Sequence, residues 1–133
     1  MEKRNLGNTG TKVGALGIGA MSFSDFYGPT NTQESHAILK MALDNGIDHI
    51  DTAKVYGMGL SEERIGQFLN TLSPKDRQFF KIATKGGIDR KNFDDKGTVV
   101  FDNSKEFLTE ELNNSLRRLG VDCVELYYVH RRE

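Results

Sequence analysis

Two patterns of apolar and polar residues alternate along the chain. Short apolar runs at residues 47–51, 79–85 and 123–130 have the length of strands, and in each segment before them apolar residues recur every three or four positions. We therefore expect helices at about 31–45, 61–70 and 103–119, which end close to Gly46, Pro74 and Gly120. Strands that alternate with helices in this way predict an α/β fold, with parallel strands joined by right-handed crossovers.

The ends of two expected helices carry capping signals. Asn31 or Thr32 suits the N-cap of the first helix, whose apolar positions are Ala37, Ile38, Met41 and Ala42. Asn103 stands three residues before Glu106, the spacing of a capping box, which predicts Asn103 as N-cap of the third helix.

Shorter segments flank these units. Residues 3–13 read as a hairpin of two strands around a glycine-rich turn, and residues 15–19 as a buried first strand. A loop with Phe23, Phe26 and Tyr27 follows, and these rings are expected either to line a substrate pocket or to pack the loop. The polar stretch 89–103 is interpreted as a long loop. All of this is assigned to a single domain, residues 1–133, with strands one to four and three intervening helices in residues 15–130.

Composition narrows the possible partners. The chain has 18 basic and 19 acidic side chains and a net charge of −1, which gives no basic footprint for nucleic acid. No apolar run approaches the roughly 20 residues of a membrane-spanning helix, so no membrane partner is expected. One cysteine, Cys123, is expected to be a buried, inert thiol, and a cytoplasmic location is the default expectation. The spacing of histidine and cysteine predicts no metal site, and His49 is assigned to the core.

Ionisable residues end the expected strands: Asp51, Lys85 and His130. A doubly wound sheet would need a glycine-rich phosphate turn, and Gly17-Ile18-Gly19 lacks the third glycine of that fingerprint. A (β/α) barrel places catalytic groups at the carboxyl ends of different strands, as the three residues are placed here. The pattern therefore favours a TIM-type barrel, of which this chain supplies about four βα units.

Tyr56 follows Asp51 by five residues, which suits a redox or proton-transfer site. A nearby ammonium lowers the pKa of a phenol, so Lys85, paired with Asp51, would let Tyr56 act as general acid near neutral pH. His130 would donate a hydrogen bond to a carbonyl oxygen or help to relay its proton.

This constellation resembles the aldo-keto reductases, a family of NADPH-dependent barrel enzymes, and the resemblance extends from near the amino terminus to the last residue. The subgroup that it resembles has a histidine–arginine pair after the fourth strand, here His130-Arg131. The segments that carry the resemblance are residues 4–10, 17–21, 51–57, 61–63, 65–66, 83–85, 115–122 and 127–131.

The resemblance implies a catalytic tetrad of Asp51, Tyr56, Lys85 and His130 that reduces aldehydes or ketones to alcohols. Tyr56 would protonate the carbonyl oxygen, Lys85 and Asp51 would tune its pKa, and His130 would orient the carbonyl substrate. It further implies that Gly19, Ala20, Met21 and Asp51 contact the nicotinamide half of the cofactor, NADPH, with NADH as the alternative.

A complete barrel has about 250 residues, and its phosphate site usually follows the seventh and eighth strands. We therefore expect a truncated chain with weak cofactor affinity. The open edges of a half barrel would favour self-association. One alternative function is a non-catalytic, regulatory half barrel that associates with a partner chain. Another is a Schiff-base lyase that uses Lys85.

Overall fold

The computed structural model describes residues 1–93 and 99–132, with the backbone alone at residues 90–93 and 99. In chain order the strands are β1 (Lys3–Asn5), β2 (Lys12–Gly14), β3 (Gly17–Gly19), β4 (His49–Asp51), β5 (Lys81–Gly86), β6 (Ile88–Phe93), β7 (Val99–Phe101) and β8 (Leu126–Val129). The helices are the 3₁₀ helix η1 (Ala20–Ser24) and the α-helices α1 (Thr32–Asp44), α2 (Leu60–Asn70), α3 (Pro74–Phe79) and α4 (Lys105–Leu119).

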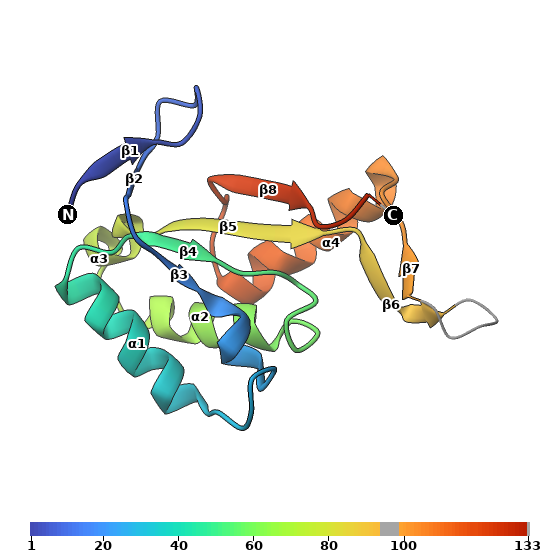
Figure 1. Ribbon diagram of the computed structural model, residues 1–133, viewed down its shortest axis with the longest axis horizontal. Helices are drawn as coiled ribbons and strands as arrows, with labels where there is room; N and C mark the ends of the chain where they lie inside the picture. The colour runs from blue at the N-terminus through green and yellow to red at the C-terminus, as the bar shows by residue number, and fades with distance from the viewer. Residues whose placement is uncertain (94–98, 133) are drawn as a thin grey trace.

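Within the described residues, β3, β4, β5 and β8 form one parallel sheet whose order follows the order of the chain. The register places Gly19 opposite Asp51, and Lys85 opposite Tyr128. Figure 1 shows that the arrows of these strands point the same way, so their carboxyl ends lie at one edge of the sheet. A doubly wound sheet reverses its strand order, and this one does not. The predicted α/β architecture, a part of a (β/α) barrel, is therefore confirmed.

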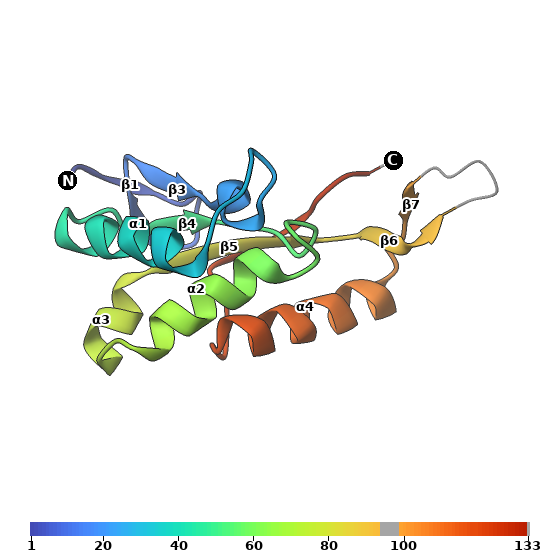
Figure 2. The ribbon, with the colours of Figure 1, turned by 90° about the horizontal axis from the view of Figure 1, so that it is seen from below.

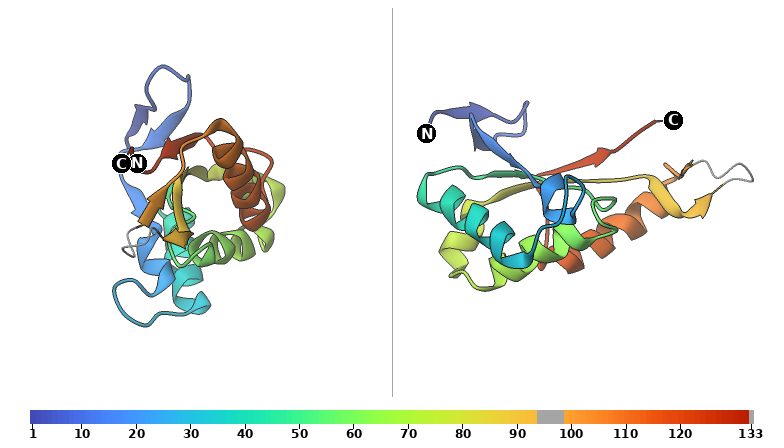
Figure 3. Two further views of the ribbon diagram at one scale, coloured as in Figure 1. Left: turned by 90° about the vertical axis from the view of Figure 1, so that its right-hand side faces the viewer. Right: turned by 60° about the horizontal axis from the view of Figure 1, so that its bottom comes forward.

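Helices α1, α2 and α4 cover one face of the sheet (Figure 2). The antiparallel hairpin of β1 and β2 lies on the other side, near the amino ends of the strands (Figure 3). Side chains alternate between the two faces, because successive residues of a strand point in opposite directions. Ile50, Ile82 and Thr84 are buried, whereas Asp51 and Lys85 stay partly exposed. The core consists of Ala20, Phe23, Leu39, Ala42, Ile50, Ile65, Phe68, Leu69, Phe80, Ile82 and Leu119.

The helix caps agree with the sequence at α1 and differ at α4. Asn31 is the N-cap of α1, and its side chain accepts a hydrogen bond of 2.8 Å from the Glu34 amide. The N-cap of α4 is Ser104, whose hydroxyl accepts from the Phe107 amide at 3.2 Å, so the prediction of Asn103 was wrong by one residue. Asn103 is used elsewhere, because its side-chain amide donates to the carbonyl oxygen of Arg131 at 3.0 Å.

Three elements differ from what the sequence predicts: β6 and β7 lie in an expected loop, and α3 was not predicted. In the stretch 89–103, β6 and β7 pair antiparallel and project beyond the carboxyl end of β5 (Figures 1 and 2). The β-forming residues of 99–101 are too few to give a periodic signal, and residues 94–98 of the expected loop lie outside the described residues. Helix α3 begins at Pro74, with Ser73 as N-cap, because a serine–proline pair that follows one helix can also begin the next.

Three burial expectations were wrong. Cys123 is exposed, because β8 begins three residues later, at Leu126. In α1 the buried positions are Ser35, Leu39 and Ala42, and Ile38 and Met41 are 44% and 68% exposed. The first strand, β3, lies at an edge of the described sheet, and its two glycines are exposed. A search of the described helices for a segment long and apolar enough to cross a bilayer finds none.

Candidate active site

The predicted catalytic residues lie on consecutive strand ends. Asp51 is the last residue of β4, Lys85 is the last residue but one of β5, and His130 directly follows β8. The His130 amide donates to the Gly86 carbonyl oxygen at 2.9 Å, which keeps this residue beside β5. Tyr56 lies in the segment between β4 and α2. Because parallel strands end at the same edge, this arrangement brings the four residues together.

Lys85 is the centre of the group. Its Nζ donates to the Asp51 carboxylate, to the Thr52 carbonyl oxygen at 2.8 Å and to the Tyr56 hydroxyl at 3.3 Å. The side chain of Lys85 is 13% exposed and that of Asp51 is 45% exposed, so the ion pair is open to solvent on the carboxylate side. The rings of Tyr56 and His130 meet edge to face, with 5.9 Å between centroids. One ammonium therefore connects a carboxylate with a phenol that also touches an imidazole.

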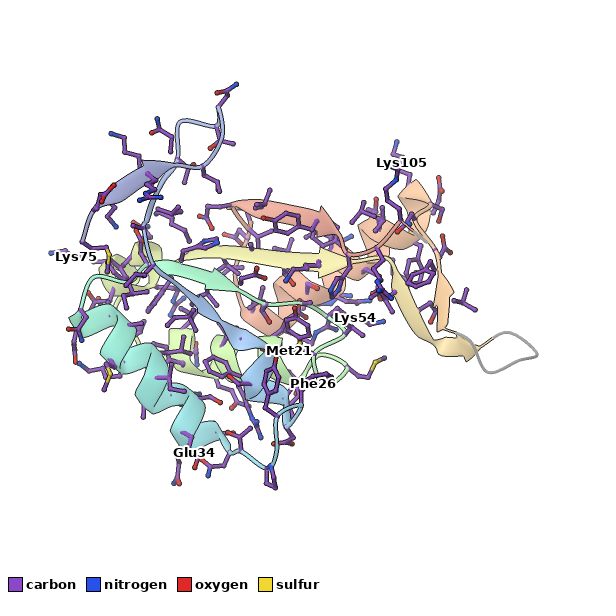
Figure 4. The ribbon with its side chains drawn as sticks, viewed as in Figure 1. Met21, Phe26, Glu34, Lys54, Lys75 and Lys105 are labelled. Atoms are coloured by element: carbon purple, nitrogen blue, oxygen red, sulfur yellow. The ribbon has the colours of Figure 1, made fainter. Side chains whose placement is uncertain are left out.

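A hollow of about 550 Å³ opens beside Tyr56 and His130. Figure 4 shows Met21 and Phe26, which line it, close together at the end of β3 and η1. Phe26 thus fits the expectation that an aromatic residue of this loop lines a pocket, whereas Phe23 belongs to the core and Tyr27 is 73% exposed. The residues that line the hollow are Met21, Ser24, Phe26, Val55, Tyr56, Gly57, Met58, Ile88, His130 and Arg131.

The residues expected to touch a cofactor differ in accessibility. Gly19 is exposed, and a Cβ placed on it would meet nothing within 4 Å. Met21 is half-buried and Asp51 presents its carboxylate at the same edge of the sheet. Ala20 exposes no surface, and its carbonyl oxygen accepts a hydrogen bond of 2.8 Å from the Ser61 hydroxyl. Gly19 and Asp51 are therefore opposite each other at the carboxyl edge of the sheet, and Met21 lines the hollow beside Tyr56.

Sequence reasoning missed the polar contacts that support this group. The hydroxyls of Thr52 and Ser61 lie 2.9 Å apart, and because Ser61 donates to Ala20, Thr52 is the donor between them. The pair ties the segment after β4 to the one after β3. Glu62 is fully buried and accepts from the Thr84 hydroxyl at 2.6 Å and from Arg118 Nε at 2.7 Å. Glutamate in the first turn of a helix is common, so the residue type and position do not indicate this buried role.

Tyr127 lies behind the site and is no candidate for proton transfer at neutral pH. Burial and the charges of Glu111 and Glu62 together outweigh the charge of Arg118 and raise the pKa of Tyr127 to about 12. Its hydroxyl donates to the Leu108 carbonyl oxygen at 3.3 Å. In residues 1–93 and 99–132 no group of three histidine, cysteine or carboxylate side chains is placed to hold a metal ion. His49 Nδ1 is buried without a hydrogen-bond partner among those residues, and the ring lies against Gly17.

Comparison with known proteins identifies relatives along nearly the whole chain. The model of the Aldo/keto reductase family matches residues 15–133. Aldo-keto reductase yakc [NADP(+)] of Schizosaccharomyces pombe is 35% identical over 128 residues, which cover 96% of this chain and 36% of the relative. L-galactose dehydrogenase of Arabidopsis thaliana is 35% identical over 130 residues, 98% of this chain and 38% of the relative.

A solved structure gives the same result for the fold. The holo form of an aldo-keto reductase from Bacillus halodurans superposes with a TM-score of 0.79 at 35% identity, over 96% of this chain and 39% of that one. The chain thus spans less than half the length of each relative named here.

Proposed function

Because the chain belongs to the aldo/keto reductase family, we propose that it carries the catalytic residues of a nicotinamide-dependent oxidoreductase that reduces aldehydes or ketones to alcohols. The observation that supports this most directly is the contact between Lys85 Nζ and the Tyr56 hydroxyl, at 3.3 Å. A general acid must lie within reach of the oxygen that it protonates, and Tyr56 lines the hollow of about 550 Å³.

The roles of the four residues follow from their contacts. Tyr56 donates its proton to the carbonyl oxygen, and the Lys85 ammonium stabilises the phenolate that remains. Asp51 pairs with Lys85 and fixes its Nζ beside Thr52 and Tyr56. His130, whose ring meets that of Tyr56, borders the same hollow and orients the carbonyl group. Each of these residues contacts the next, in the order Asp51, Lys85, Tyr56 and His130.

A nicotinamide cofactor supplies the hydride for such a reduction when it is bound. Gly19, Met21 and Asp51 are the residues of this chain that would contact its nicotinamide half, since Gly19 is opposite Asp51 at the carboxyl edge of the sheet and Met21 lines the hollow beside Tyr56. We propose NADPH as this cofactor, with NADH as the alternative, because one relative is named for NADP(+). The hollow has apolar walls at Phe26, Val55 and Ile88, which suits a carbonyl compound with an apolar substituent.

The Schiff-base alternative has less support. A lysine nucleophile must be a neutral amine, and an ammonium has three N–H donors. Lys85 directs its Nζ to Asp51, Thr52 and Tyr56, which engages all three donors. An amine held in this way is suited to stabilise a neighbouring oxygen anion.

The test is turnover of an aromatic aldehyde by the chain at millimolar NADPH, followed by the loss of NADPH absorbance. Tyr56→Phe removes the proton donor and keeps the ring, so we expect the rate to fall by roughly 10²- to 10⁴-fold. Tyr27→Phe is the matched control, because Tyr27 is 73% exposed and lies outside the hollow beside Tyr56. An unchanged rate for Tyr56→Phe, with the variant folded, would contradict the assignment.

A second candidate, also a proposal, is a non-catalytic half barrel that associates with a partner chain or a second copy. The observation in its favour is the open surface at both edges of the described sheet. At one edge, Tyr128 and Val129 of β8 are 40% and 47% exposed. At the other, between β3 and α1, a hollow of about 210 Å³ is lined by apolar side chains, namely Ile18, Ala37, Ile38, Met41, Ala42 and Ile47.

Sedimentation velocity together with an NADPH titration separates the two candidates. A stable oligomer that neither binds NADPH nor turns over would support the second candidate. In that case Met41→Lys should dissociate the oligomer. Lys40→Gln, at the preceding position of α1, which is also exposed, should leave it intact. A monomer with cofactor-dependent turnover would exclude the second candidate.

A further inference from the structure

A buried ion pair lies next to the candidate site and takes no part in the chemistry described above. Lys54, between Asp51 and Tyr56, and Glu111, in the middle of α4, are each only 7% exposed. Lys54 Nζ and Glu111 Oε2 are 3.1 Å apart. Lysine and glutamate are rarely buried so deeply unless they are paired. Figure 4 shows Lys54 at the edge of the sheet where the strands end, near Met21.

The two charges depend on each other. Glu111 Oε2 has no hydrogen-bond partner in the part of the chain that the structure describes, so the neighbouring Lys54 ammonium compensates its charge. Removal of one member of a buried pair leaves the other charge uncompensated, which is costly. The pair therefore couples the segment that contains Lys54 to α4.

That segment contains Tyr56 and belongs to no helix or strand, so its backbone bonds are isolated ones. The Lys54 amide donates to the Lys85 carbonyl oxygen at 3.3 Å, and the Tyr56 amide donates to the Ala53 carbonyl oxygen at 3.1 Å. The first is longer than usual for an N–H donor to a carbonyl oxygen, and the second is near the upper end of the usual range. Segments held in this way open locally more easily than helices and sheets do.

Helix α4, in contrast, is regular and close to the end of β5. It has a serine N-cap and a glycine C-cap over 15 residues. Glu111 Cβ would lie 3.5 Å from a Cβ on Gly86, the residue after Lys85. The same helix thus lies against the strand that carries Lys85 and, through Glu111, contacts the segment that carries Tyr56.

We propose that Lys54 and Glu111 are positioning residues, whose ion pair holds the segment 52–57 against α4 and thereby keeps the Tyr56 hydroxyl in contact with Lys85. The inference rests on the proposed function for its catalytic meaning, but the positional effect can be measured without turnover. A purely structural pair would instead stabilise the whole domain without a particular effect on Tyr56.

Amide hydrogen exchange of the 133-residue chain distinguishes these roles. In Lys54→Met and Glu111→Gln we expect exchange at residues 54 and 56 to accelerate about tenfold or more, while exchange at Ile50 in β4 changes much less. The double variant should accelerate by less than the product of the two single effects, because the side chains act as a pair. Arg118→Met is the matched control: Arg118 is in α4, as Glu111 is, and its loss breaks the pair with the buried Glu62 of α2 but leaves Lys54 and Glu111 in place.

A second readout is the His130 ring, whose NMR signals are shifted by the Tyr56 ring 5.9 Å away. In Lys54→Met and Glu111→Gln these signals should move towards those of free histidine, and in Arg118→Met they should stay. Acceleration that is uniform over the chain, or equal in Arg118→Met, would overturn the proposal, as would unchanged exchange at residue 56. Absence of turnover in the unsubstituted chain would count against the proposed function alone, because neither readout needs substrate.

Discussion

Gly66 in α2 lies so close to Arg118 in α4 that a Cβ at position 66 would come within 3.0 Å of the Arg118 carbonyl oxygen. The obstacle is backbone, at the end of a helix that is closed by the C-cap Gly120. A side chain could rotate away, whereas this carbonyl can move only if the helices separate. The missing side chain of Gly66 therefore sets the distance between α2 and α4, the helices that carry Glu62 and Glu111.

Gly66→Ala should lower the stability of the chain, although the replacement of glycine by alanine in a helix usually raises stability. Alanine is favoured over glycine by about 1 kcal/mol in a helix interior. Overpacking of a close contact costs about 1–3 kcal/mol, and because the contact is with backbone we expect the cost to prevail. Urea unfolding gives the free energy of unfolding, with Gln67→Ala, at an exposed position of the same helix, as control. Increased stability of Gly66→Ala would show that the helices separate easily.

Ser104 and Asn103 should differ when each is changed to alanine. Ser104 caps α4 by accepting from the Phe107 amide, and loss of an N-cap side chain costs about 1 kcal/mol. Asn103 lies one residue earlier and contacts the backbone of Arg131 and Arg132. We therefore expect Ser104→Ala to lower the helical circular dichroism signal at intermediate urea more than Asn103→Ala does. The reverse order would restore Asn103 as the functional cap.

These two residues show where the sequence is sufficient and where it is not. The order of strands and helices follows from local periodicity, and it places Asp51, Lys85 and His130 at one edge because parallel strands must end together. The capping signal is ambiguous by one position, since Asn103 and Ser104 both have suitable side chains. The position of the residues after β8 decides between them, because the Arg131 carbonyl oxygen accepts from the Asn103 side chain.

Contacts between segments that are distant in the chain could not be predicted from the sequence, because they also depend on how the elements pack. Lys54 and Glu111 each look like solvated charges in the sequence, and their pairing depends on how closely α4 approaches β5. Exposure of Ile38 and Met41 depends on which face of α1 meets the sheet, and a stripe of apolar residues does not show how much of it the sheet covers.

Asp48 should make stability depend on pH in the acid range. Burial alone would raise the pKa of Asp48, but hydrogen bonds from Lys3 and the Gly14 amide, with the Lys3 charge, outweigh it and hold the pKa below the usual 3.8. A carboxyl with a lowered pKa in the folded state stabilises the fold above pH 3.8, and this contribution disappears as the pH falls through the lowered value. Asp48→Asn should cost about 1 kcal/mol at pH 7.

The urea midpoint between pH 2 and pH 5 checks this prediction. The unsubstituted chain should lose more stability on acidification than Asp48→Asn does, so the two curves approach each other at low pH. Asp44→Asn is the control, because its pair with Lys40 in α1 is exposed and contributes little. Parallel curves for the chain and Asp48→Asn would show that the pKa of Asp48 is not lowered by folding.

Tyr127 should produce the corresponding effect in the alkaline range. Its pKa is raised to about 12, first by burial and then by the charges of Glu111 and Glu62, whereas an unfolded tyrosine ionises near 10. A raised pKa in the folded state stabilises the fold below pH 10, and this contribution is lost as the pH rises from about 10 towards about 12. Tyr127→Phe removes this loss, so its urea midpoint should fall less steeply above pH 10, whereas Tyr27→Phe, which alters a mostly exposed phenol, should follow the unsubstituted chain. If Tyr127→Phe also followed the unsubstituted chain, the Tyr127 hydroxyl would have to reach solvent, and α4 could not lie as close to Gly86 as the positioning of Tyr56 requires.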